Sequence, residues 1–195
     1  MKLILASSSP RRAEILREAG ISFSVLSSAV DETLIPGETP QQHVLRLADA
    51  KGELVAARAV APAIIISADT VVVLDGQILG KPRSTDEARH MLELFSGRTH
   101  SVVTGVTVLR LPEMDRRQFI ETTLVHFVKL SSDEISRYLA TAEPYDKAGA
   151  YAIQGRAGRY IPRIEGCYFN VVGLPLARVV SALHELGWSE ESEPL

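Results

Sequence analysis

Residues 63–80 read AIIISADTVVVLDGQILG, a run of branched aliphatic residues that contains Ser67 and Asp69 and is followed by Asp75-Gly76. Such runs are typical of buried strands, and an Asp-Gly pair between two apolar segments predicts a tight hairpin. The stretch therefore predicts a central strand that turns back on itself. An isolated carboxylate inside such a run is costly unless it is paired, solvated or bound to a metal ion.

Strand-like and helical patterns alternate along the rest of the chain, which predicts a mixed α/β fold. Short strands are expected at 2–6 and 23–28, and two long strands on either side of a polar hairpin loop at 112–117. Capping residues and 3.6-residue periodicity predict helices at 9–20, 39–58, 84–97, 131–141 and 174–187. Residues 143–173 are expected to form an ordered loop with short elements. We expect a single domain over residues 1–188, followed by an acidic, frayed tail at 189–195.

Composition narrows the class of protein. The chain has 195 residues, a hydrophobic content of 46%, a formal net charge of -3 and one cysteine, Cys167. A single cysteine excludes an intrachain disulfide framework, and the charge gives no general basic field for nucleic acid or anionic membranes. The N-terminal pattern is not that of a signal peptide, and no apolar run reaches the length of a membrane span. We expect a cytoplasmic protein with neither a nucleic-acid nor a membrane partner.

Residues 3–12, LILASSSPRR, predict a strand, a short loop and the start of a helix with Ser9 as its N-cap. A helix N-terminus offers unpaired N–H groups and a positive dipole end, to which Ser7 adds a hydroxyl. Arg11 and Arg12 oppose the dipole in the first helical turn, and a bound anion would reverse that effect. The pattern indicates a phosphate cradle, and the alternative is a turn followed by a solvated helix start.

Carboxylates and lysines complete the set of candidate residues. Asp31 and Glu32 follow a predicted strand, Asp69 lies within one, Lys51 lies on the long helix and Lys81 follows the hairpin. Oxygen ligands without a histidine or cysteine cluster favour Mg²⁺ or Mn²⁺. Together with the cations they indicate a magnesium-bound polyphosphate. For each residue taken singly, the alternative is a solvated charge or a hydrogen-bonded strand end.

The segment DKAGAYAIQG, residues 146–155, is rich in small residues that let a ligand approach the backbone closely. Its Gln154 carries an amide that can read the edge of a base. The alternative is a tight structural loop.

Several segments, in order, carry a resemblance: ASSSPRR, VDET, LADAKGE, SADTVVVLDGQILGKP, SGRTHSVVTGV, EPYDKAGAYAIQG and VVGLPL. From about residue 3 to residue 187 the chain resembles the Maf (septum-formation-inhibitor-like) nucleoside triphosphate pyrophosphatases. The resemblance implies hydrolysis of nucleotides to monophosphate and pyrophosphate, as house-cleaning of nucleotide pools with a link to cell-division arrest. It implies a fold similar to the inosine triphosphate pyrophosphatases: an elongated, twisted mixed sheet flanked by helices, with two lobes and a central cleft. It also implies a homodimer.

The resemblance further implies a substrate class. In this family three positions separate the branches, and here they are Arg11, Thr70 and Gln154, which resemble the dTTP/UTP pyrophosphatases. Modified pyrimidine nucleotides are further candidate substrates. One position departs from the family pattern, because Ala152 stands where a glycine is usual. If that position needs a positive φ, alanine costs stability or shifts the loop.

The mechanism that the resemblance implies is metal-assisted attack of water on the α-phosphorus. Glu32 and Asp69 are expected to hold Mg²⁺ or Mn²⁺, and Asp69 to accept the proton of the water. The residues expected at the phosphates are hydroxyl-bearing or cationic: Ser7, Arg12, Lys51 and Lys81. Lys81 and Glu32 are expected to share in catalysis with Asp69.

Two other functions compete with this one. A nucleotide-sensing regulator needs the cations but not the carboxylates, so the presence of both Glu32 and Asp69 favours an enzyme. A phosphomonoesterase would release orthophosphate, and product analysis separates it from a pyrophosphatase.

Overall fold

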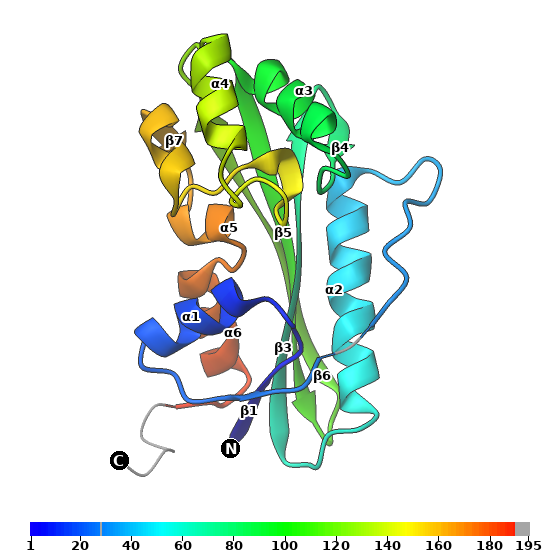
Figure 1. The fold of residues 1–195 in the computed structure, drawn as a ribbon. Coiled ribbons are helices and arrows are strands. Elements are labelled where there is room, and N and C mark those ends of the chain that lie inside the picture. The colour runs from blue at the N-terminus through cyan, green and yellow to red at the C-terminus, as the bar shows by residue number, and fades with distance from the viewer. Residues whose placement is uncertain (28, 190–195) are drawn as a thin grey trace. The chain divides into compact units, whose positions relative to one another are not determined.

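The structure, a computed structural model, describes residues 1–27 and 29–189, which form a mixed α/β fold (Figure 1). One seven-stranded sheet has the order β2-β1-β3-β5-β6-β7, and β4 pairs with β3. Strand β1 is parallel to β2 and β3, whereas β4 and β7 pair in the antiparallel sense, so the sheet is mixed as predicted. The strands are β1 (Lys2–Leu5), β2 (Ser24–Val25), β3 (Ala63–Leu74), β4 (Gln77–Leu79), β5 (Thr99–Leu111), β6 (Asp115–His126) and β7 (Arg163–Glu165).

Helices occupy the predicted segments. The α-helices are α1 (Pro10–Glu18), α2 (Pro40–Ala56), α3 (Thr85–Phe95), α4 (Ser132–Leu139), α5 (Tyr168–Val172) and α6 (Leu176–Glu185). The segment 143–173 holds two 3₁₀ helices, η1 (Ala148–Ala150) and η2 (Arg156–Tyr160), together with β7 and α5, as the prediction of short elements required. None of the helices in the described part of the chain is long and apolar enough to cross a membrane.

The described residues divide into two compact units, and neither is continuous in sequence. The first contains Met1–Thr70, Thr104–Glu121 and the residues from Gly173 onward, and the second contains Val71–Val103 and Thr122–Val172. The chain passes from one unit to the other within β3, β5 and β6. The prediction of one domain over residues 1–188 stays a prediction, as does the cleft. Most of the predicted tail, residues 190–195, lies outside the described residues.

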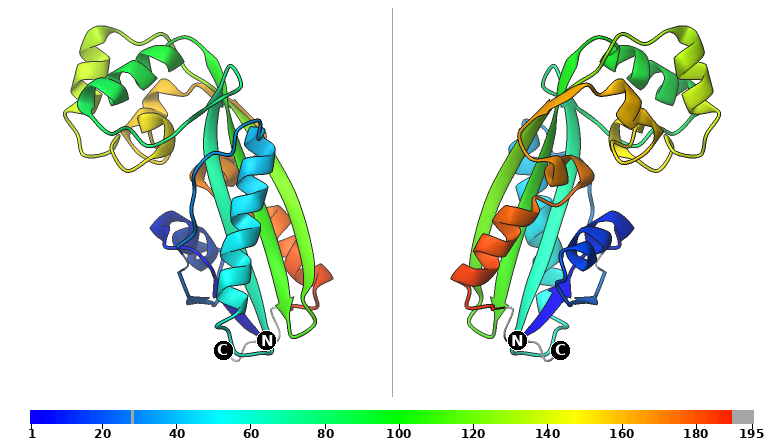
Figure 2. Two further views of the ribbon diagram at one scale, coloured as in Figure 1. Left: turned by 90° about the vertical axis from the view of Figure 1, so that its right-hand side faces the viewer. Right: turned by 90° about the vertical axis from the view of Figure 1, so that its left-hand side faces the viewer.

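In the first unit, helix α2 is packed unusually close to the sheet. A Cβ atom on Gly52 of α2 would lie 2.8 Å from Ser67 Oγ of β3, and one on Gly105 of β5 would lie 2.6 Å from the backbone of Val44 in α2. Helix α2 covers one face of these strands, and α1 and α6 cover the other (Figures 1 and 2). Gly52 on the helix and Gly105 on the sheet thus allow the backbone of α2 to approach the strands closely.

Local signals explain most element ends. Thr39 forms a capping box with Gln42 and is followed by Pro40, as the sequence predicts for α2. Asp75 and Gly76 have φ values of 50° and 77°, which confirms the tight hairpin between β3 and β4. The expected loop at 112–117 is too long, because β6 already begins at Asp115.

Two helix starts differ in detail from the sequence prediction. Ser9 is the N-cap residue of α1, but its side chain caps nothing among the described residues. Instead, the Oγ atom of Ser7 accepts a hydrogen bond of 3.2 Å from the backbone N–H of Ser9. The last helix, expected at 174–187, begins later, because α6 starts at Leu176 with Pro175 as its N-cap residue.

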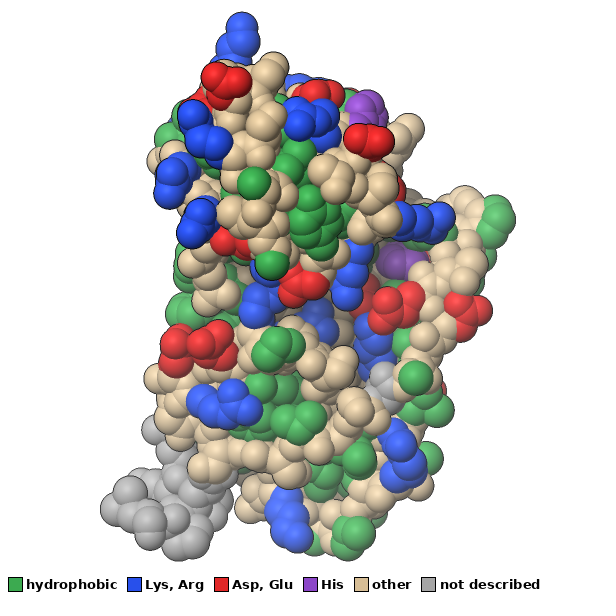
Figure 3. Space-filling model, in the orientation of Figure 1, with side chains coloured by type: hydrophobic (Ala, Val, Ile, Leu, Met, Phe, Trp, Pro, Cys, Tyr) green, Lys and Arg blue, Asp and Glu red, His purple; other side chains and the backbone are tan. Residues whose placement is uncertain are grey.

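The second unit has its own core, built around an aromatic group. Phe95, His100, Phe127 and Tyr151 lie in mutual ring contact. The first unit has a separate core cluster that joins Ile4, Ile65, Val55 and Leu109 from three strands and α2. Charged side chains of both signs are spread over the face that Figure 3 shows, in keeping with the net charge of -3.

Candidate active site

A buried lysine holds two of the predicted carboxylates together in the first unit. The Nζ atom of Lys51 lies 2.6 Å from Glu32 Oε1 and 2.7 Å from Asp69 Oδ1. The side chains of Lys51 and Asp69 are 10% and 11% exposed, whereas that of Glu32 is 62% exposed. The structure therefore brings together three of the predicted site residues, which come from three separate segments of the chain.

The packing of α2 explains why Lys51 reaches Asp69. Side chains two apart on a strand point to the same face, so Ser67 and Asp69 share a face of β3. Gly52 lies against Ser67, and the neighbouring residue of the helix, Lys51, lies against Asp69. The buried carboxylate in the apolar run thus has a charged partner, which offsets part of the free-energy cost of burying it.

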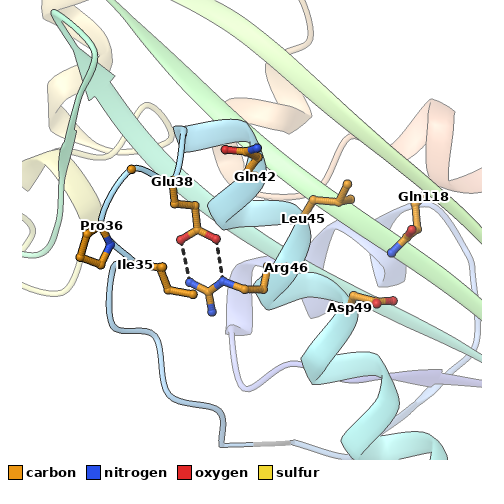
Figure 4. Close-up of a pocket in the computed structure, with 9 residues that line it drawn as sticks. Ile35, Pro36, Glu38, Gln42, Leu45, Arg46, Asp49 and Gln118 are labelled. Carbon is orange, nitrogen blue, oxygen red and sulfur yellow. Dashed lines mark hydrogen bonds and ion pairs between the residues drawn. The ribbon is translucent and has the colours of Figure 1, made fainter.

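Glu32 lies in a loop that Arg46 of α2 anchors. Arg46 donates a hydrogen bond of 3.2 Å to the carbonyl oxygen of Thr33, the residue after Glu32. Arg46 also forms a bidentate ion pair with Glu38, in which Nε donates to Oε1 at 2.6 Å and Nη2 donates to Oε2 at 2.8 Å (Figure 4). The hydrogen bond from Arg46 is the main cause that lowers the pKa of Glu38 to about 2. The sequence analysis did not single out Arg46, and its spacing of five residues from Lys51 places the two on different faces of the helix.

A second cluster surrounds the buried side chain of Arg12. Its Nε donates to the carbonyl oxygen of Gly173 at 2.8 Å, its Nη1 to Ser7 Oγ at 3.2 Å and its Nη2 to Thr70 Oγ1 at 3.0 Å. Thr70 Oγ1 lies 2.9 Å from Thr104 Oγ1. Arg12 thus joins Ser7 and Thr70, two other predicted site residues, and the hydroxyl of Thr70 is already engaged with protein groups.

Electrostatics connect the Arg12 cluster with the carboxylates. Burial is the main cause that lowers the pKa of Arg12, and the charge of Asp69 offsets part of this shift. An arginine stays protonated at neutral pH even so. The helix that carries Arg12 begins without an acidic residue in its first turn. A buried cation at such a helix start is a favourable place for an anion.

Three predicted site residues remain: Arg11, Lys81 and Gln154. Arg11 is half-buried on α1, and within the described residues it makes neither a hydrogen bond nor an ion pair. Lys81 and Gln154 belong to the second unit, and both are exposed. Within that unit their loops are linked, since the N–H of Gly149 donates to the carbonyl oxygen of Gly80 at 3.0 Å.

The concern about Ala152 is resolved. Positive φ values occur in this loop at Gly149, 72°, and at Ala150, 58°, but not at Ala152. Alanine therefore meets no left-handed strain at position 152. The buried Ala150 is the residue that adopts the backbone conformation that favours glycine.

Two carboxylates are a donor set that fits a hard cation such as Mg²⁺. Mg²⁺ is usually held by one or two carboxylates, with substrate phosphates and water as its other ligands. Glu32 and Asp69 converge on one point, the Nζ atom of Lys51, as such ligands must. A site made of three or more His, Cys, Asp or Glu residues does not occur in the part of the chain that the structure describes.

A surface pocket lies beside the Glu32 loop but includes none of the predicted residues (Figure 4). Its lining joins the loop, α2 and β6: Ile35, Pro36, Gly37, Glu38, Gln42, Leu45, Arg46, Asp49 and Gln118. The Glu38–Arg46 pair forms part of its wall. The residues that line the pocket thus include the pair that holds the Glu32 loop against α2.

Fold and site together define an α/β protein with a buried arginine at a helix start and a lysine that bridges two carboxylates. The chain belongs to the Maf family, described as Maf-like protein. The model of this family matches residues 2–186. This confirms the resemblance drawn from the ordered motifs.

Curated relatives are similar over almost the whole chain. The dTTP/UTP pyrophosphatase of Geotalea uraniireducens is 50% identical over 188 residues, which cover 95% of each chain. That of Carboxydothermus hydrogenoformans is 46% identical over 188 residues, 96% of this chain and all of the relative. A solved structure, the Ham1 protein of Staphylococcus aureus, is 14% identical with a TM-score of 0.46, over 82% of this chain and 91% of that one.

Proposed function

We propose that this protein is a nucleoside triphosphate pyrophosphatase that hydrolyses dTTP and UTP to the monophosphate and pyrophosphate. The observation that carries the proposal is the 44–50% identity, over at least 95% of the chain, to relatives named dTTP/UTP pyrophosphatase. The cluster of Glu32, Lys51 and Asp69 supports it, since a phosphoryl-transfer site needs both carboxylates and cations. Modified pyrimidine nucleotides are further proposed substrates.

Glu32 and Asp69 would hold a divalent ion, Mg²⁺ or Mn²⁺, which would neutralise charge on the triphosphate. Asp69 is the proposed proton acceptor for the water that attacks the α-phosphorus. Lys51, at 2.7 Å from its Oδ1 atom, orients that carboxylate and can stabilise charge that develops on a phosphate oxygen. The attack breaks the bond between the α-phosphorus and the bridging oxygen, and pyrophosphate leaves.

Arg12 and Ser7 are proposed to contact the triphosphate at the start of α1, and the bond between them sets their relative position. The same role is proposed for Lys81 on the basis of the family resemblance. Arg12 has five N–H donors, so an anion can share it with Ser7, Thr70 and Gly173.

Base recognition is proposed for Arg11, Thr70 and Gln154. Uracil and thymine share an O4 acceptor and an N3–H donor, whereas cytosine presents the reverse pattern. A site that pairs with the first pattern leaves polar groups unpaired against the second, and such mismatches discriminate strongly. For Thr70 the hydroxyl network favours a role through Arg12 rather than a direct bond to the base.

A nucleotide panel tests the proposal. The purified protein is incubated with dTTP, UTP, CTP, dATP and GTP in the presence of Mg²⁺ or Mn²⁺, and pyrophosphate and orthophosphate are measured separately. We expect pyrophosphate, with dTTP and UTP as the best substrates. Orthophosphate as the sole product would indicate a phosphomonoesterase, and binding without turnover would indicate a nucleotide-sensing regulator.

The cellular setting is proposed from the family resemblance. The enzyme would remove unwanted nucleotides from the cytoplasmic pool as a homodimer, and its activity would be linked to cell-division arrest. Light scattering coupled to gel filtration measures the oligomeric state. A mass near 21.3 kDa, that of one chain, would contradict the homodimer.

A further inference from the structure

Gln154 is presented by a tight turn in the second unit. The N–H of Gly155 donates to the carbonyl oxygen of Ala152 at 3.1 Å, so Ile153 and Gln154 are the two central residues of a β-turn. Ala152 is buried and Gln154 is exposed. The direction of the Gln154 side chain therefore depends on how firmly the turn at 152–155 is held.

A tyrosine and a glutamate hold both ends of this turn. The hydroxyl of Tyr138, in α4, accepts a hydrogen bond of 3.2 Å from the N–H of Ala152 and donates one of 2.7 Å to Glu143 Oε1. The carboxylate of Glu143 accepts bonds of 3.0 Å from the N–H of Arg156 and 3.4 Å from that of Ala157. One side chain thus fixes the entry of the turn, the second fixes its exit, and a hydrogen bond joins them.

The carboxylate of Glu143 lies directly against Gly155 of the turn. A Cβ atom on Gly155 would lie 2.3–2.4 Å from three atoms of the Glu143 carboxylate. A side chain at position 155 would therefore push the Glu143 carboxylate out of its present place, so the clamp in this form needs glycine there. The glycine of the IQG motif thus allows the Glu143 carboxylate to lie close to the turn backbone.

The charge states of the pair agree with this geometry. Burial raises the pKa of Glu143, but the bonds from Arg156, Tyr138 and Ala157 outweigh it, so the pKa lies below its ordinary value. Burial, and then the bond to Glu143, raises the pKa of Tyr138. At neutral pH the ionised carboxylate of Glu143 therefore accepts from three donors, the Tyr138 hydroxyl and the N–H groups of Arg156 and Ala157. The fourth hydrogen bond, from the N–H of Ala152, ends on the Tyr138 hydroxyl.

We infer that Tyr138 and Glu143 are positioning residues for substrate specificity, because they clamp the turn that presents Gln154. This inference rests on the proposed function, in which Gln154 reads the pyrimidine. Neither Tyr138 nor Glu143 is proposed to contact the substrate. They act through the backbone of residues 152–157.

The first test measures specificity. Tyr138→Phe removes the shared hydroxyl, and Glu143→Gln keeps the size of the side chain but replaces one acceptor oxygen by an amide. Each is expected to raise KM for dTTP and UTP roughly tenfold, with a smaller change in kcat, and to reduce the preference for UTP over CTP by a similar factor. Tyr145→Phe is the matched control, since Tyr145 bonds to the carbonyl oxygen of Leu139 and not to the turn. An unchanged UTP to CTP ratio in both variants would overturn the inference.

The second test does not depend on activity. Amide hydrogen exchange of the unliganded protein should show faster exchange at Ala152 in Tyr138→Phe and at Arg156 and Ala157 in Glu143→Gln. Exchange of the amides in α4 should stay close to that of the wild type. If wild-type protein hydrolyses neither dTTP nor UTP, the proposed function fails, while this experiment still reports on the clamp. Unchanged exchange at all three amides would show that the clamp does not exist.

A double-mutant cycle provides a third test. Gly155→Ala should reduce the preference for UTP over CTP roughly tenfold in the wild-type background, because the new methyl group displaces the Glu143 carboxylate. In the Glu143→Ala background this contact is gone, so the same change should have a several-fold smaller effect. Equal effects in both backgrounds would contradict the need for glycine against the Glu143 carboxylate. Circular dichroism at the assay temperature identifies any variant that does not fold.

Discussion

Single residues carry the chemistry of the candidate site, and Lys51 shows how. A buried lysine is costly unless it is paired, and here it lies within 2.7 Å of two carboxylates. Removal of one of the three charges changes the electrostatic environment of the other two. The three side chains therefore respond as a unit, and a change at Asp69 affects more than one proposed role.

Asp69→Asn should lower the turnover of dTTP by at least roughly two orders of magnitude, because an amide cannot accept the proton of the attacking water. The amide oxygen can still accept a bond from Lys51, so the fold should survive. Pyrophosphate release and thermal unfolding of the same preparation measure the two effects. Retained turnover would exclude Asp69 as the proton acceptor.

His100 illustrates a residue whose effect depends on pH. Its Nε2 lies 2.7 Å from the hydroxyl of Tyr151, and burial lowers its pKa to about 3. The unfolded chain, with a pKa near 6.5, binds the proton first. The stability due to neutral His100 is therefore complete above about pH 6.5 and is lost as the pH falls toward 3, at up to about 1.4 kcal/mol per pH unit.

His100→Gln should flatten this acid side of the stability curve. Urea unfolding at intervals between pH 7 and pH 4 gives the free energy of unfolding of both proteins. The difference between them should narrow as the pH falls, since only the wild type loses stability through His100. Parallel curves would show that His100 does not titrate as its burial implies.

Among the elements, the loop at 31–38 is held in position by side chains of α2: Lys51 pairs with Glu32, and His43 and Arg46 pair with Glu38. It has no regular secondary structure, and Arg46 ties it to α2 at Thr33 and Glu38. Because the same helix carries Lys51, the anchor keeps Glu32 in register with Lys51 and Asp69. The loop that supplies a proposed metal ligand is thus held by a residue outside the proposed ligand set.

Arg46→Gln should loosen this loop and raise the Mg²⁺ concentration for half-maximal activity roughly tenfold, with a smaller effect on turnover at saturating Mg²⁺. Arg58→Gln is the control, because Arg58 lies on the surface and bonds only to the carbonyl oxygens of Leu54 and Ser27 among the described residues. A Mg²⁺ titration of pyrophosphate release measures the effect. Equal shifts in both variants would argue against the anchor.

At the scale of the whole chain, residues far apart in sequence meet through the sheet. Strand β1 lies beside β3 in the sheet order, and α2 packs closely on β3 and β5 through Gly52 and Gly105. This packing determines whether Lys51 reaches Asp69. A change at the contact between helix and strand should therefore affect both the stability and the site.

Gly105→Ala should destabilise the protein by about 2 kcal/mol, because the methyl group would meet the backbone of α2 at 2.6 Å. Activity should fall as well, since a displaced α2 carries Lys51 away from Asp69. Gly80→Ala is the control for stability, because no atom of the described residues lies within 4 Å of its added Cβ. Denaturant unfolding of both variants tests this, and equal stabilities would contradict the close packing of α2.

Sequence patterns were sufficient for features that depend on neighbouring residues. The caps at Thr39 and Ser131, the Asp75-Gly76 hairpin and the alternation of strands and helices follow from contacts within a few residues. The ordered motifs also determined the family, because they combine residue types and order over nearly the whole chain.

The tertiary structure decided which candidates meet. Asp69 lies 18 residues from its partner Lys51, and Arg12 lies 58 residues from Thr70 and 161 from Gly173. Such pairs depend on strand order and on how closely a helix can approach a sheet, and neither is encoded in a local pattern. The roles of Arg46, Tyr138 and Glu143 became visible only there, since each of them also bonds to backbone groups of a distant segment, and backbone groups have the same chemistry in every sequence.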